Sequence, residues 1–158
     1  MAATIPEGAR VFVLTGWPEI EGFEETWNDD TPIADDTPTT HSRAYFEQLV
    51  SLLNGSMRQE VTLIPSAEVL YRLAPRLEAG EVPGISNLDA LFSDEVHLGS
   101  PGNWVSGVTA ATVMTGLSAD TFGKPGDPWY GSGDEYSAEF IQLVRGIVDD
   151  VVGRPATG

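Results

Sequence analysis

The sequence lacks cysteine, has few cations and contains no long apolar run. Without cysteine, this chain of 158 residues forms no disulfide, no thiolate nucleophile and no cysteine-based zinc site. No segment approaches the ~20 consecutive apolar residues of a membrane helix. Residues 1–8 show neither the basic part nor the apolar part of a signal peptide. The compartment stays undecided, because a cysteine-free chain suits either redox environment.

Positively charged residues are also few. Eight Lys and Arg residues stand against 24 Asp and Glu residues, which gives a formal net charge of −16. Such a surface repels phosphate backbones and anionic lipid, so nucleic acid and membrane are poor partners. An acidic surface is typical of a salty habitat, of cation binding or of simple solubility, and we favour solubility.

What is present indicates a globular protein. Hydrophobic residues make up 41% and charged residues 20% of the chain, which predicts a single domain over residues 1–158 with a sizeable core. Residues 19–40 form a long acidic segment with no helical apolar stripe, which we expect to be a loop. The calcium-loop spacing of an EF-hand is absent there, so we expect solvated carboxylates and no metal. Residues 154–158 should form a frayed tail.

Two short apolar runs alternate with amphipathic segments. Val11–Leu14 and Val61–Ile64 are rich in β-branched residues and predict strands buried on both faces, as in parallel sheets. Helical spacing of apolar residues follows three starts, at Thr39 or Thr40, at Ser66 and near Asp134. A fourth helix is discussed below. This rhythm predicts an α/β fold with parallel strands flanked by four helices.

Two residues come directly after the first predicted strand. Ligands of open α/β sheets bind beyond the carboxyl ends of the strands, so Trp17 and Glu19 are candidates for substrate binding. Simple packing of Trp17 under a loop is an equally good interpretation. His41, in the first turn of the next helix, is expected to be a surface residue.

The main candidate site is an acid and a histidine three residues apart, Asp94 and His97. A strong helix start follows them, with Ser100 as the expected N-cap and Pro101 as the first helical residue, and this helix should end at Gly116. The pair therefore lies on a loop held by a packed helix, which is how a catalytic base is usually presented. We expect the carboxylate and the imidazole to lie about 2.6–3.2 Å apart.

The segment Asp-Glu-Val-His-Leu at 94–98 resembles the last conserved block of the SGNH (GDSL-type) hydrolases, a family of serine esterases and lipases. The resemblance implies a flavodoxin-like, three-layer α/β/α fold. It also implies that His97 is the general base for a serine and that Asp94 orients its imidazole. A small-molecule ester substrate, with no cofactor, follows from the same resemblance.

The nucleophile half of such an enzyme is not recognisable. The family's serine lies in a Gly-Asp-Ser segment, but the two Gly-Asp pairs here, at 126–127 and 133–134, are followed by proline and glutamate. Two strands are also too few, since a parallel sheet usually has about five. We therefore expect the C-terminal portion of an SGNH-like domain, incomplete at its N-terminus, with self-association or a complementing chain.

Two other functions stay open. One is a non-catalytic binding module that holds a carbohydrate or a cation with Trp17, Trp27, Trp129 and the acidic segment. The other is a structural or partner-dependent domain derived from the same fold.

Overall fold

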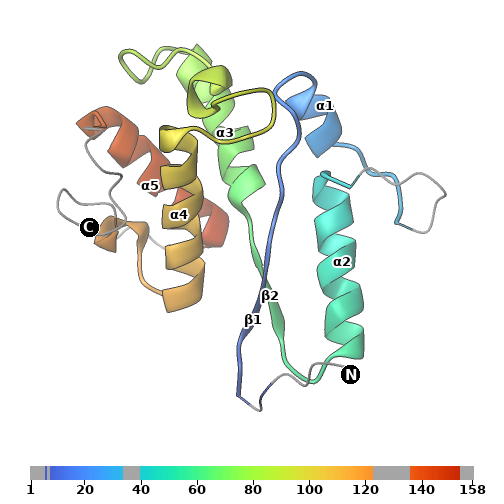
Figure 1. Cartoon of the computed structure of the whole chain (residues 1–158). Coiled ribbons are helices and arrows are strands. Elements are labelled where there is room, and N and C mark those ends of the chain that lie inside the picture. The colour runs from blue at the N-terminus through green and yellow to red at the C-terminus, as the bar shows by residue number, and fades with distance from the viewer. Residues whose placement is uncertain (1–5, 7, 34–39, 123–135, 154–158) are drawn as a thin grey trace.

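The computed structural model describes residues 6, 8–33, 40–122 and 136–153, and these form a mixed α/β fold (Figure 1). The two strands of this part are β1 (Val11–Leu14) and β2 (Val61–Ile64). Its α-helices are α1 (Phe23–Trp27), α2 (Arg43–Ser56), α3 (Ser66–Glu78), α4 (Ser100–Thr115) and α5 (Ala138–Val152). Two 3-10 turns, η1 (Leu88–Leu91) and η2 (Ala119–Thr121), lie on either side of α4.

The predicted strands are confirmed in both position and direction. β1 and β2 pair in parallel, with Val11 opposite Val61 and Leu14 opposite Ile64. The side chain of Asn54 fixes the start of β2, because it accepts a hydrogen bond from the Val61 amide at 2.7 Å and donates one to the Val61 carbonyl at 3.1 Å. Helix α2 lies on one side of the strand pair and α4 on the other (Figure 1). The carboxyl ends of both strands therefore lie at the same edge.

The strand pair is only partly covered, so the expectation that both strands are buried on both faces is wrong. No residue of β1 is fully buried, and Leu14 is 47% exposed. A continuous apolar strand is normally enclosed on both faces. The exposure of β1 therefore fits a sheet that takes further covering or further strands.

Three helix starts differ from the sequence-based expectation. Ser42, not Thr40, caps α2 by accepting the Tyr45 amide at 3.1 Å, and Thr39 lies outside the described residues. Ser66 and Ser100 are the first helical residues of α3 and α4, so neither is the N-cap. Their hydroxyls have other partners, since each makes a side-chain hydrogen bond to another hydroxyl. A serine near a helix start identifies the start to within one residue only.

Helices α5 and α1 also differ from the sequence-based expectation. Helix α5 begins at Ala138 with Ser137 as its cap, whereas Asp134 lies outside the described residues, as does the 154–158 tail. The expectation that 19–40 is irregular throughout is wrong, because α1 forms within it. Phe23 and Trp27 are one helical turn apart and both are buried, which holds this short helix in place through tertiary packing.

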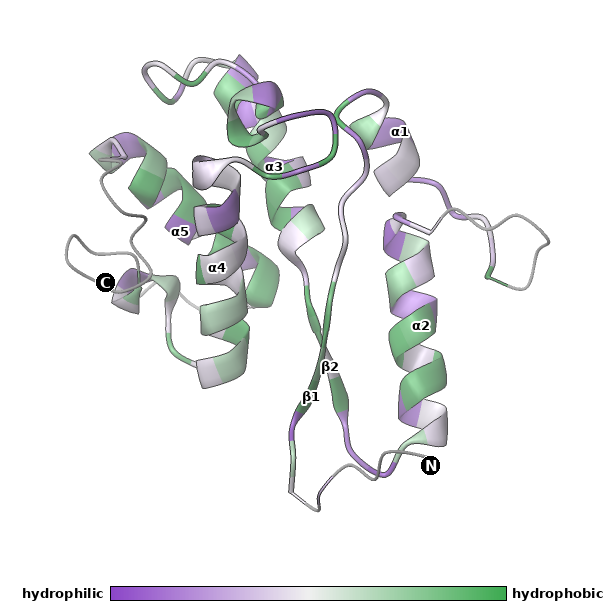
Figure 2. Ribbon diagram, in the orientation of Figure 1, coloured by the Kyte–Doolittle hydropathy of each residue, from purple (hydrophilic) through white to green (hydrophobic). Residues whose placement is uncertain are grey.

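The core lies between α3, α4 and α5, whose apolar faces turn toward one another (Figure 2). Helix α3 contributes the longest buried stripe, with Leu70, Leu73 and Leu77 fully enclosed. This packing makes α3 and α4 rigid supports for the loops at their ends. No helix of the described ranges is both long enough and apolar enough to span a bilayer.

Candidate functional site

Asp94 and His97 lie on a short closed loop, residues 92–99, which we name the dyad loop. Phe92 and Leu98 form an antiparallel bridge at its base, and the Ser93 amide donates to the His97 carbonyl at 2.8 Å. Below this bridge, the Gly99 amide donates to the Leu91 carbonyl at 2.8 Å. These backbone bonds bring the two ends of the loop together and fix how far its tip can move.

The predicted contact between the two side chains is present. Asp94 Oδ2 lies 2.8 Å from His97 Nδ1. Asp94 Oδ1 accepts the backbone amides of Val96 at 2.9 Å and of His97 at 2.7 Å. These two amides, followed by the imidazole, hold the pKa of Asp94 at about 2, below its usual 3.8. The carboxylate is therefore ionised at neutral pH and oriented by the loop itself.

The imidazole faces solvent. The His97 side chain is 74% exposed and that of Asp94 is 54% exposed. When Nδ1 carries the proton and donates it to Asp94, the lone pair lies on Nε2. Nε2 has no hydrogen-bond partner among the described residues. The dyad loop thus presents an oriented base whose reactive nitrogen is unoccupied within the described part of the chain.

The segment after β1 is fastened to the dyad loop at two points. The indole N–H of Trp17 donates to the Val96 carbonyl at 2.8 Å, and the Ile20 amide donates to the Glu95 carbonyl at 3.0 Å. Glu19 is exposed between these two residues. The structure therefore brings Trp17 to the same site as the dyad, with its polar atom occupied in holding the loop.

Helix α4 supports the loop from below through a glycine. A Cβ on Gly102 would lie 2.3 Å from the Leu91 carbonyl oxygen and 2.7 Å from Leu98 Cδ2. Only a residue without a side chain lets α4 approach this closely. Asn103 adds a hydrogen bond from its side chain to the Leu98 carbonyl at 3.0 Å. Sequence reasoning missed Gly102, although a glycine in the first turn of a helix was a visible signal.

His41 is exposed as predicted, yet it lies at the carboxyl end of β1. Its ring packs against Gly16, where a Cβ would lie 3.1 Å from His41 Cδ2. His41, the second histidine of the chain, therefore contacts the residue that precedes Trp17, and Trp17 in turn contacts the dyad loop. A glycine two residues after the strand was the only sequence signal for this approach.

No serine of the described ranges hydrogen-bonds the His97 imidazole. The Ser93 hydroxyl donates to the His97 carbonyl at 3.1 Å, not to the ring. The hydroxyls of Ser66 and Ser106 lie 3.1 Å from each other, and Ser42 is buried at the start of α2. Each of these hydroxyls is occupied elsewhere, so the described part of the chain places no serine nucleophile at the His97 imidazole.

A second carboxylate, Glu68, lies in very different surroundings. Its oxygens accept the Trp27 indole N–H at 3.0 Å, two N–H groups of Arg43 at 3.0 and 2.6 Å, and one of Arg72 at 2.7 Å. Burial alone would raise the pKa of Glu68, but these bonds outweigh it and the pKa is lowered. Trp27 is only 1% exposed, so it cannot line a carbohydrate site on the surface. Trp129, proposed for the same role, lies outside the described residues.

Comparison with protein-family models, with curated proteins and with solved structures gives no match for this chain.

Proposed function

We propose that this chain supplies the base half of an SGNH-like serine hydrolase that acts on small-molecule esters. The observation that carries the proposal is the Asp94–His97 contact of 2.8 Å on a loop that leaves Nε2 unoccupied among the described residues. A general base needs this combination of fixed orientation and open access. In this proposal no cofactor takes part, and neither nucleic acid nor membrane is a partner.

The proposed chemistry is acyl transfer in two steps. His97 Nε2 takes the proton of a serine hydroxyl as its oxygen attacks the ester carbonyl, and the same proton then leaves with the alcohol. Water, activated in turn by His97, hydrolyses the acyl-enzyme. Asp94 keeps the Nδ1 proton in place and stabilises the imidazolium that forms in each step. Trp17 and Glu19 would lie beside the bound substrate.

The nucleophile and the oxyanion donors must then come from outside the described residues. The partly exposed β1 supports this, because additional strands at its free edge would enclose it. We propose that a complementing segment, from the same polypeptide, a second copy or another chain, completes a flavodoxin-like three-layer sheet. A partner-dependent structural domain is the alternative, and the same exposed strand favours it.

The test is hydrolysis of a short-chain aryl ester by the purified chain, with His97→Ala as the matched variant. We expect equal and negligible rates, because the base has no serine to activate. Addition of a complementing segment that carries a serine should raise the rate in the native chain and not in His97→Ala. Turnover by the native chain alone that is lost in His97→Ala would contradict the incompleteness of the site. No turnover with any complementing segment would favour the structural alternative.

A further inference from the structure

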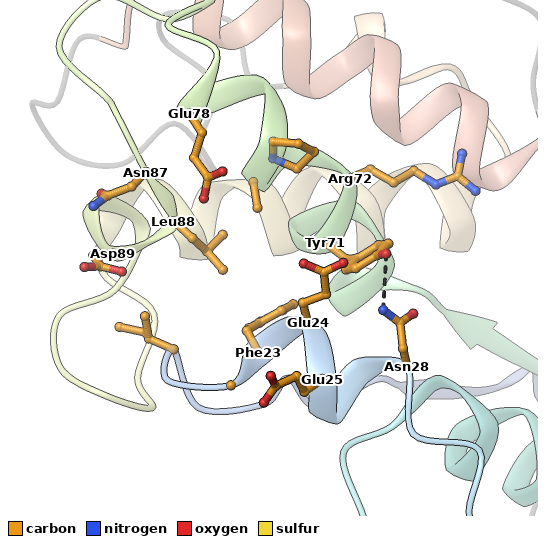
Figure 3. A pocket seen from close by; sticks show the side chains of 14 residues that line it. Phe23, Glu24, Glu25, Asn28, Tyr71, Arg72, Glu78, Asn87, Leu88 and Asp89 are labelled. Carbon is orange, nitrogen blue, oxygen red and sulfur yellow. Dashed lines mark hydrogen bonds between the residues drawn. The ribbon is translucent and has the colours of Figure 1, made fainter.

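A large cavity lined by described residues lies away from the dyad, between α1, α3 and η1 (Figure 3). It has a volume of about 1000 Å³ and an apolar floor. Its apolar lining residues, which we call the floor, are Ile20, Phe23, Ala74, Pro75 and Leu88. Ligand cavities are typically of about 300–1000 Å³ with mostly apolar walls and a few polar groups. This cavity therefore has the size and floor of a small-molecule site.

Its charged groups are almost all of one sign. Carboxylates reach it from three separate elements, with Glu24 and Glu25 on α1, Glu78 on α3 and Asp89 on η1. None of the four makes an ion pair within the described ranges. Figure 3 shows Glu24 and Glu78 extending from α1 and α3 toward the space over Phe23 and Leu88.

Elsewhere on α3 and just after it the carboxylates are paired. Glu68 binds Arg43 and Arg72, and Glu81 binds Arg76. Among the described residues, Arg72 is the only cation that lines the cavity, and its Nε is bonded to Glu68. Four carboxylates from three elements thus line the cavity, and within the described chain they are opposed only by Arg72, whose Nε is already bonded to Glu68.

We propose that this cavity binds an organic cation with an apolar, aromatic body. Its ammonium group would lie beside the carboxylates, and its ring would lie over the apolar floor, of which Ile20, Ala74 and Pro75 are accessible to water. A bare metal ion fits less well, because no three carboxylates or histidines of the described residues come together as metal ligands. The site is independent of the proposed hydrolase, since neither Asp94 nor His97 lines it.

The probe is tryptamine, an indole with an ammonium group, and its neutral counterpart is tryptophol. Each is titrated into the full chain labelled with ¹⁵N, and amide shifts are followed at low and at high salt. We expect saturable shifts for tryptamine at α1, α3 and η1, binding of tryptophol at least about fivefold weaker, and weakening by salt.

Two pairs of substitutions separate the cavity from the general acidity of the protein. Glu24→Gln with Glu78→Gln should weaken tryptamine about five- to tenfold. Glu60→Gln with Glu139→Gln changes the net charge equally at exposed positions outside the cavity, and should change binding less than about twofold. Ala74→Phe fills the floor without changing charge and should abolish saturation.

Three results would overturn the proposal. One is an absence of saturable shifts with tryptamine. Another is equal affinity for tryptophol, which would leave the carboxylates without a role. The third is equal weakening by the two pairs of substitutions, which would show only attraction to a surface of net charge −16.

Discussion

Asp94 and Glu68 are two carboxylates that each accept several hydrogen bonds, and both have lowered pKa values. The bonds of Glu68 come from side chains of three different elements, and its side chain is only 14% exposed. Those of Asp94 come mainly from two amides within its own loop, and its side chain is 54% exposed. Glu68 therefore joins distant parts of the chain, whereas Asp94 bonds only Val96 and His97 of its own loop.

The difference shows how similar chemistry serves two purposes. Around Glu68 the described donors all meet the same two oxygens, so the cluster is closed and structural. At the dyad the hydrogen-bond network ends at the imidazole of His97, a side chain that is exposed to solvent. The proposed base role requires such an open end, because a proton must be taken from a group that is not yet part of the network. Four changes test this comparison, in order of decreasing expected effect.

The support of the dyad loop by α4 should give the largest effect. Gly102→Ala places a methyl group 2.3 Å from the Leu91 carbonyl oxygen. We expect the free energy of unfolding to fall by about 3 kcal/mol, because neither backbone can move easily. Gly107→Ala, in the same helix with no atom within 4 Å of its Cβ position, should stabilise the protein by about 0.5–1 kcal/mol. Chemical denaturation measures the free energy of unfolding of both variants. Equal values for Gly102→Ala and Gly107→Ala would contradict the close approach of α4 to the Leu91 carbonyl.

Breaking the closed cluster should come next. Glu68→Gln removes the charge that Arg43 and Arg72 share, and we expect a loss of about 2 kcal/mol in the free energy of unfolding. The loss should be smaller than for a fully buried pair, because both arginines reach solvent. Glu81→Gln removes the partner of Arg76 at an exposed pair and should change stability far less. A larger loss of stability in Glu81→Gln than in Glu68→Gln would contradict the expected order of the two ion pairs.

The pKa of Asp94 gives a pH-dependent effect of known sign. A lowered pKa in the folded state stabilises the protein above about pH 4, and this stabilisation is lost as the pH falls from about 4 to 2. In His97→Ala the titration midpoint of Asp94, followed by its carboxyl ¹³C shift, should rise but stay below 3.8, since the amides of Val96 and His97 remain. A return to 3.8 would mean that the imidazole, and not the loop, orients Asp94.

The smallest effect is expected for the tether to the segment after β1. Trp17→Phe keeps an aromatic ring and removes the hydrogen bond to the Val96 carbonyl. We expect a loss of at most about 1 kcal/mol, confined to the dyad loop. Amide hydrogen exchange at Val96 and His97 should be a few times faster, with no change in Glu19→Gln. Unchanged exchange in Trp17→Phe would show that Trp17 does not hold the loop.

Local chemistry explains which parts were predictable. The strands at 11–14 and 61–64 follow from short β-branched runs, and their parallel pairing follows from the helix-sized segment between them. The contact between Asp94 and His97 was predictable because it closes over three residues. Helix α1 was not predictable, since five residues in an acidic segment become helical only when Phe23 and Trp27 find a core.

The sequence by itself determined the pieces that depend on near neighbours: the two strands, the glycines that end α4 and α5, and the orientation of the imidazole by Asp94. Only the tertiary structure decided that Trp17 holds the dyad loop, that His41 reaches Gly16 and that Glu68 gathers two arginines and an indole. Apart from the Glu68–Arg72 pair within α3, these contacts join residues 25 to 79 positions apart. Their distances are set by how helices pack, and periodicity along the chain carries no information on that packing.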